Sequence, residues 1–167
     1  MEYLFLRRKK TSGTSVRQKA LLYRAAGREW TARFSSLSDV RPADSLIYKG
    51  ILYQLEIRRA FLDSSLSLKK LSVMLETNQT YLSNAVNRYF GCHLKELVNT
   101  YRVEYAKELL RSGKCLPEEL PQRCGFLSRS AFYAAFKKVT GVSPPTLYEI
   151  WTERKSSRNQ QNMYNQF

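Results

Sequence analysis

Two stretches decide the fold: QTYLSNAVNRYFG at residues 79–91 and RSAFYAAFKKVTG at residues 129–141. Both contain large apolar residues one helical turn apart and a closing glycine, namely Leu82, Val86 and Gly91 in the first copy and Phe132, Phe136 and Gly141 in the second. An internal repeat of this kind defines the architecture of a chain. Each copy therefore predicts an amphipathic helix that ends at its glycine, where a positive φ carries no steric cost.

A short apolar pattern precedes each copy. It contains Leu71, Val73, Met74 and Leu75 before the first helix, and Leu116, Leu120 and Cys124 before the second. Two short helices joined by a tight turn form a helix-turn-helix, so we expect one unit at about residues 67–91 and another at about 116–141. Ser67, and either Thr77 or Asn78, are suited to cap the two helices of the first unit.

One long helix is predicted between the two units, at about residues 93–112. Its apolar stripe leads to Gly113, which ends it. At about 1.5 Å per residue it would be close to 30 Å long, near the roughly 34 Å between major-groove faces one DNA turn apart. The predicted fold is therefore all-α, with two three-helix, homeodomain-like helix-turn-helix units bridged by one long helix.

The flanking segments set the expected boundaries of this helical domain at residues 49–154. A helix is predicted to begin near Ile51, and the Pro144-Pro145 pair to open a final helix. Residues 1–48 are expected to form a basic leader or linker with one helix at about 15–34, followed by a loop up to Asp44. The polar tail at 155–167 is expected to be disordered.

The chain of 167 residues carries a formal net charge of +14 and has a pI of about 9.9. Such a charge is typical of nucleic-acid binders, and a basic surface or an anionic-membrane binder would share it. Charge alone does not choose DNA over RNA. RNA recognition commonly uses aromatic residues on a sheet, and no sheet is predicted here.

The helix at residues 79–91 has a polar face without Lys or Glu, unlike an ordinary solvated helix face. Asn and Gln can pair bidentately with adenine, and Thr can meet a thymine methyl group. The candidate DNA-binding residues of the first unit are Asn78, Gln79, Thr80, Ser83, Asn84, Asn87 and Arg88. Those of the second unit are Ser128, Arg129, Ser130, Tyr133, Lys137 and Lys138.

Not every basic residue is expected to read bases. Lys137 and Lys138 are expected to meet phosphates, which position a protein without choosing sequence. Arg102, beside Tyr101 in the long helix, is expected in a buried or interface ion pair.

Residues 67–149 resemble the DNA-binding domain of AraC-type (AraC/XylS) helix-turn-helix transcription regulators. The resemblance is carried by Leu71-Ser72, Thr80-Tyr81-Leu82-Ser83, Gly91, Asn99-Thr100-Tyr101-Arg102, Ala106, Leu109-Leu110, Gly125-Phe126, Ser128, Ser130, Phe132, Phe136-Lys137-Lys138, Gly141, Ser143-Pro144 and Tyr148. It implies a seven-helix domain that binds promoter DNA, often as an activator that touches RNA polymerase.

The stretch from Tyr53 to Leu82 looks closer to a subgroup common in Bacteroidetes bacteria. In that subgroup the domain often lies at the cytoplasmic end of a larger sensor, and Arg7 to Lys10 resemble the segment just inside a membrane span. We expect a cut-down relative, a fragment or a stand-alone regulator. The β-barrel effector domain of sugar-responsive relatives does not fit in residues 1–48, so no small-molecule effector site is expected.

Three residues depart from the family pattern. Pro121 stands where the family usually has Ala, Pro117 near its usual Ile, and Ala134 where the family often has Arg. Proline inside a helix costs about 3 kcal/mol, so the first helix of the second unit should be short and begin near one of these prolines. We expect the first unit to carry most of the specificity and the second mainly backbone affinity.

The residue types and spacings of the sequence give little support for a catalytic site or a metal site. His93 is the only histidine, and its neighbour Cys92 points about 100° away on a helix, so the two do not form a nucleophile–base pair. No zinc spacing and no phosphate loop are present, and no cofactor is expected. The three cysteines, with no framework for disulfides, fit a reducing cytoplasm.

Two alternatives stay open. A degenerate helix-turn-helix can serve as a protein-interaction adaptor, and Pro117, Pro121 and Ala134 are compatible with that. The basic N-terminal segment could embrace DNA, lie on an anionic membrane surface, tether a partner or form a disordered leader.

Overall fold

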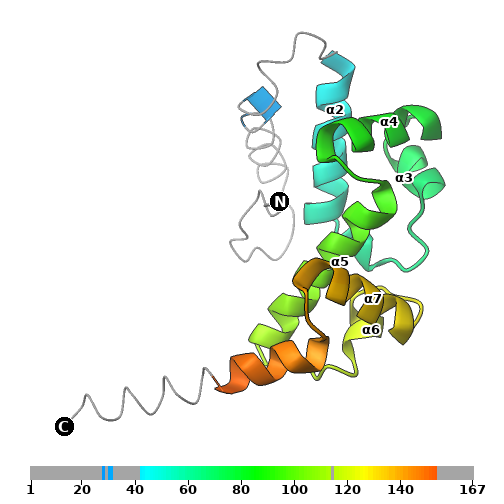
Figure 1. Cartoon of the computed structure of the whole chain (residues 1–167). Coiled ribbons are helices and arrows are strands. Elements are labelled where there is room, and N and C mark those ends of the chain that lie inside the picture. The colour runs from blue at the N-terminus through cyan, green and yellow to red at the C-terminus, as the bar shows by residue number, and fades with distance from the viewer. Residues whose placement is uncertain (1–27, 29, 32–41, 114, 154–167) are drawn as a thin grey trace. The chain divides into compact units, whose positions relative to one another are not determined.

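The computed structural model describes residues 28, 30–31, 42–113 and 115–153, and every regular element in these residues is helical (Figure 1). The predicted all-α fold is thus confirmed. The chain divides into two compact units between Tyr101 and Arg102. The long helix α5 (Leu94–Arg111) has residues in both units.

The first unit begins with α2 (Pro42–Leu52), which continues into a π-helical turn η1 (Tyr53–Ile57) and a 3-10 turn η2 (Ala60–Leu62). This corrects the predicted loop up to Asp44 and the predicted helix start near Ile51. Proline is well suited to the first turn of a helix, and the carboxylate of Asp44 lies in that turn, where it complements the helix dipole. The helix therefore crosses residue 48, the expected domain boundary.

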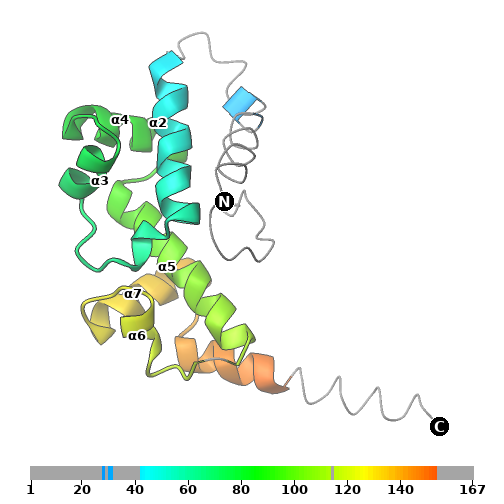
Figure 2. The ribbon, with the colours of Figure 1, turned by 180° about the vertical axis from the view of Figure 1, so that it is seen from behind.

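The helix-turn-helix of the first unit consists of α3 (Leu68–Met74) and α4 (Gln79–Phe90). The side chains of Ser67 and Asn78 accept hydrogen bonds from the backbone N–H groups of Lys70 and Tyr81 and so cap the two helices, as predicted. Gly91 ends α4 with φ of 68°. Figures 1 and 2 show α4 beside α2 and α3, and it packs against both.

The core of the first unit joins α2, α4 and the first half of α5. Tyr48 stacks on Phe90 with ring centroids 5.2 Å apart, and Phe61 stacks on Tyr101 at 5.9 Å. Trp30 packs against Tyr48 as well. The fully buried aliphatic residues of this core are Ile51, Leu52, Leu55, Leu71, Leu82, Val86 and Leu97.

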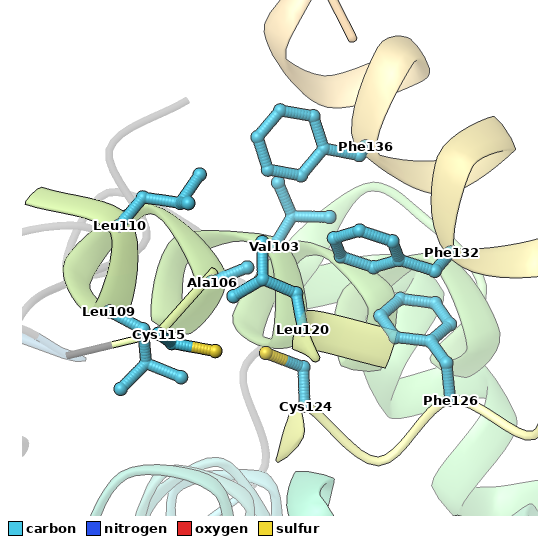
Figure 3. Packing of buried hydrophobic residues seen from close by; sticks show 10 residues of the cluster. All are labelled: Val103, Ala106, Leu109, Leu110, Cys115, Leu120, Cys124, Phe126, Phe132 and Phe136. Carbon is cyan, nitrogen blue, oxygen red and sulfur yellow. The ribbon is translucent and has the colours of Figure 1, made fainter. Parts of the chain in front are cut away.

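The second unit contains α6 (Leu120–Arg123), α7 (Arg129–Thr140) and a final helix at residues 144–153. Figure 3 shows its core, in which Phe126, Phe132 and Phe136 meet residues of α5 and α6. The short α6 is as predicted, because Pro121 lies in its first turn, where no backbone N–H is required.

Three residues of the short apolar patterns that precede α4 and α7 are exposed. The exposed fractions are 71% for Val73, 39% for Met74 and 56% for Leu116. Helix α3 has only seven residues and buries a narrow face, with Leu71 and Ser72 inside. Leu116 lies before α6 rather than in it, so helical spacing does not apply to its side chain.

The predicted tail at 155–167, and most of the leader at 1–48, lie outside the described residues. Of the helices that the structure describes, none combines the length and the apolar character needed to cross a membrane.

Candidate nucleic-acid interface

Helix α4 presents a polar face that is open to solvent. Its exposed candidates are Gln79, Thr80, Asn84, Asn87 and Arg88, with the cap Asn78 exposed beside them and Ser83 half-buried. The opposite face is buried and consists of Leu82, Ala85, Val86, Tyr89 and Phe90. The structure thus brings all seven predicted residues of the first unit to one helix and its N-terminus.

Asn78 has a structural task besides its predicted one. Its side-chain oxygen accepts a hydrogen bond of 2.7 Å from the backbone N–H of Tyr81. The oxygen therefore serves the helix N-terminus, and the amide N–H₂ group is the part that can donate to a base or a phosphate.

A buried carboxylate lies behind α4, at Asp44 of α2. The hydroxyls of Tyr81 and Tyr89 both donate to it, and the Arg88 guanidinium lies 3.8 Å from its Oδ2. Burial, and then the neighbouring Asp44 carboxylate, raise the pKa of Tyr89, so this phenol keeps its proton and acts as a donor. Sequence reasoning missed Asp44 because it was assigned to a loop.

Helix α7 has the same construction in the second unit. Ser128 caps it by accepting a hydrogen bond of 3.2 Å from the Ala131 N–H, and its Oγ lies 3.2 Å from the Oγ of Ser130. The exposed candidates are Ser128, Arg129, Ser130, Lys137 and Lys138. Phe132 and Phe136 are fully buried on the opposite face, as predicted.

Arg129 and Tyr133 form a pair on the surface of α7. The Arg129 guanidinium donates a hydrogen bond of 3.1 Å to the Tyr133 hydroxyl, and its Cζ lies 5.2 Å from the centroid of the tyrosine ring. The ring itself is half-buried and meets Phe132 edge-on at 5.7 Å. The Tyr133 ring, which packs on Phe132, therefore holds the Arg129 guanidinium in a fixed orientation on the surface of α7.

Three further basic residues of the second unit differ in their exposure to solvent. Lys137 and Lys138 lie exposed in the last turn of α7, where cations also favour the helix dipole. Arg102 is buried, with an exposed fraction of 8%, and its guanidinium lies 5.2 Å from the centroid of the Phe126 ring. The prediction that Arg102 is buried rather than directed at bases agrees with this position.

Known proteins share the sequence pattern and the fold of these two units. The model of a family described as a helix-turn-helix domain matches residues 71–149. The C-terminal domain of AraT, a response regulator from Geobacillus stearothermophilus, is 29% identical with a TM-score of 0.57, over 68% of this chain and 88% of that one. A protein of unknown function from Listeria innocua is 30% identical with a TM-score of 0.55, over 61% of this chain and 94% of that one.

Residues 71–149 form a helix-turn-helix domain of the AraC type. Its fold is also that of the DNA-binding domain of AdpA, a global transcriptional factor solved in complex with a target DNA. That match has a TM-score of 0.59 at 19% identity and covers 66% of this chain and 96% of that one, so it concerns the fold alone. A comparison with curated proteins finds no significant match.

Two of the three cysteines are core residues in the structure. Cys115 and Cys124 are buried in the core of the second unit, and burial raises the pKa of Cys124 to about 12. Cys92 is half-buried, and burial raises the pKa of its thiol too. Over the described residues, His, Cys, Asp and Glu form no group of three that could hold a metal ion.

Proposed function

We propose that this chain is a sequence-specific double-stranded DNA-binding transcription regulator that inserts α4 and α7 into major grooves. The observation that carries the proposal is the exposed face of α4, which offers Gln, Asn and Thr side chains and is backed by a buried apolar face. Side chains of these types can reach base edges directly, because a major groove admits a helix.

The residue types indicate a division of labour between the two helices. The exposed polar side chains of α4, led by Gln79, Thr80 and Asn84, have hydrogen-bonding groups for bases. On α7, Ala131 and Ala134 are exposed and offer none, so Arg129, Ser130 and Tyr133 are left to contact bases there. Lys137 and Lys138 would bind phosphates, and α4 would carry most of the specificity.

We also propose that the regulator acts as an activator that touches RNA polymerase. The net charge of +14 favours DNA as the partner, because positive side chains release counterions from phosphates on binding.

A protein-interaction adaptor is the competing function, and salt separates the two. Binding should be measured by fluorescence anisotropy of a labelled duplex with the full chain at several salt concentrations. For DNA binding, log K should fall with log salt by about 0.9 per phosphate neutralised.

The double variant Lys137→Gln with Lys138→Gln tests the assignment of phosphate contacts. It should reduce the slope by up to about 1.8, since each lysine would neutralise one phosphate. The control is Lys69→Gln at an exposed position of α3, which should leave the slope unchanged. If the chain does not bind the duplex, or if its affinity for the duplex does not change with salt concentration, the adaptor function is favoured.

A further inference from the structure

Asp44 lies in α2, outside the residues 71–149 that match the family, and yet it is bonded to both ends of α4. Its carboxylate is buried, with an exposed fraction of 3% for the residue. Oδ1 accepts from the Tyr81 hydroxyl and Oδ2 from the Tyr89 hydroxyl, and Arg88 faces Oδ2. Tyr81 is in the first turn of α4, whereas Arg88 and Tyr89 are in the last.

A carboxylate that is bonded to both ends of a helix restrains the helix against sliding along its axis and against rotation about it. Tyr81 and Tyr89 are eight residues apart, which corresponds to about 12 Å along a helix axis. A slide of α4 along α2, or a rotation about its own axis, would lengthen at least one of the two hydrogen bonds. Bonds to a charged acceptor are roughly twice as strong as neutral ones, and burial excludes water that could replace them.

The aromatic packing around Asp44 holds α4 against α2 with a weaker geometric preference than hydrogen bonds to a carboxylate have. Trp30 lies against Tyr89 with ring centroids 4.8 Å apart, and Tyr48 meets Tyr89 edge-on at 6.4 Å. Apolar contacts of this kind hold α4 on α2, but the hydrophobic effect has no directionality. Packing can therefore keep the unit folded while the hydrogen bonds to Asp44 determine the rotation of α4.

We propose that Asp44 is a positioning residue for DNA reading: by holding Tyr81 and Tyr89, it sets the rotation and the register of α4 in the major groove. This inference rests on the proposed function. The base-reading candidates Gln79, Thr80 and Asn84 share one helix with the two tyrosines, so a rotation of α4 moves all three relative to the base edges. Arg88, held near Asp44, stays half-exposed and can reach a phosphate.

The test compares the full wild-type chain with Asp44→Asn, which keeps the shape and removes the charge. The readout is the ratio of Kd values for a scrambled duplex and for the best duplex from a random-library selection. Misplacing one base contact should lower this ratio by about tenfold, since a mismatched base pair has an effect of that order. The Kd for the scrambled duplex should change by less than about threefold, because phosphate binding tolerates small rotations.

Two further variants keep the result interpretable. Asp63→Asn removes a carboxylate from the exposed loop of the same unit and should leave the ratio unchanged. Tyr81→Phe should lower the ratio by itself and add little to Asp44→Asn, because one removes and the other weakens the same hydrogen bond. Urea unfolding of each variant reports stability separately.

The inference is overturned if Asp44→Asn lowers only the free energy of unfolding, or if it weakens both duplexes equally. It is also overturned if the effects of Asp44→Asn and Tyr81→Phe on the ratio are additive. If the wild-type chain itself shows no preferred duplex, the proposed function fails, and that result is recognised before any variant is made.

Discussion

Glu76 and Gly125 occupy the same place in the two helix-turn-helix turns. Both have a positive φ, 52° for Glu76 and 77° for Gly125. The residue after each donates its N–H to a carbonyl five residues back, from Thr77 to Ser72 at 3.0 Å and from Phe126 to Pro121 at 2.9 Å. This is the hydrogen-bonding pattern of a Schellman motif, which glycine favours. The first turn therefore carries a backbone strain that the second avoids.

Replacement of Glu76 by glycine should stabilise the chain. A non-glycine residue in the left-handed region costs about 1 kcal/mol or more, and part of that gain is offset by the larger entropy of glycine in the unfolded chain. We expect Glu76→Gly to raise the free energy of unfolding in urea by about 0.5–1 kcal/mol. The reciprocal Gly125→Ala should lower it. A loss of stability in Glu76→Gly would mean that the glutamate side chain makes a contact that outweighs the strain.

The pairing of Arg129 with Tyr133 predicts that lysine will not replace this arginine. Lysine keeps the charge but lacks the planar fork that can lie over a ring and bind a base bidentately. Arg129→Lys should weaken binding to the selected duplex by about tenfold or more, since a bidentate contact to guanine contributes roughly 1–3 kcal/mol. Lys138→Arg, on the same helix, is the conservative control and should change little. Equal affinities for wild type and Arg129→Lys would reduce the role of Arg129 to a phosphate contact.

Specificity should depend more on α4 than on α7. Asn84 is exposed and can bond to a base, whereas the ring of Tyr133 is partly used in packing. DNase footprints of Asn84→Ala should lose the preference for the selected site, and those of Tyr133→Ala should keep it at lower affinity. If Tyr133→Ala alone abolished the preference, the order of the two helices would be the reverse.

Acid should remove one local contribution to stability. The hydrogen bond from Lys70, then those from Ser65, lowers the pKa of Asp63 from 3.8 to about 2. Because the folded-state pKa is the lower one, this contribution is complete above the unfolded value and is lost as the pH falls toward about 2. The effect should be small, since the pair is exposed and screened by salt.

The measurement is urea unfolding of wild type and Asp63→Asn at a series of pH values from about 5 down to about 2. The advantage of wild type should shrink across this range and shrink further with added salt. A difference that does not depend on pH would assign the effect to packing rather than to charge.

The repeat predicted both helix-turn-helix units because their signals are local. Ser67, Asn78 and Ser128 cap helices within three residues of themselves, and Gly91 and Gly141 end them. Periodicity likewise placed Phe132 and Phe136 in the core. The prediction that α4 and α7 contact DNA stays a prediction, although their candidate residues lie where the pattern placed them.

The parts that sequence reasoning missed depend on distant partners. Asp44 resembles a loop residue among serines and prolines, but its tyrosine partners lie 37 and 45 residues further along the chain. The exposure of Val73 could not be foreseen either, because so short a helix leaves its buried face undefined by periodicity. Nothing local in the sequence marks the left-handed backbone of Glu76.

Selection of preferred duplexes from a random-sequence library by the full chain, at two salt concentrations, would show whether both helices recognise DNA sequence. We predict a bipartite motif whose half-sites are about one helical turn apart, with the stronger preference in the half-site that α4 contacts. Binding that is lost steeply at higher salt should accompany it. A chain that enriches no sequence and binds no duplex at either salt concentration would contradict the assignment as a DNA-binding regulator.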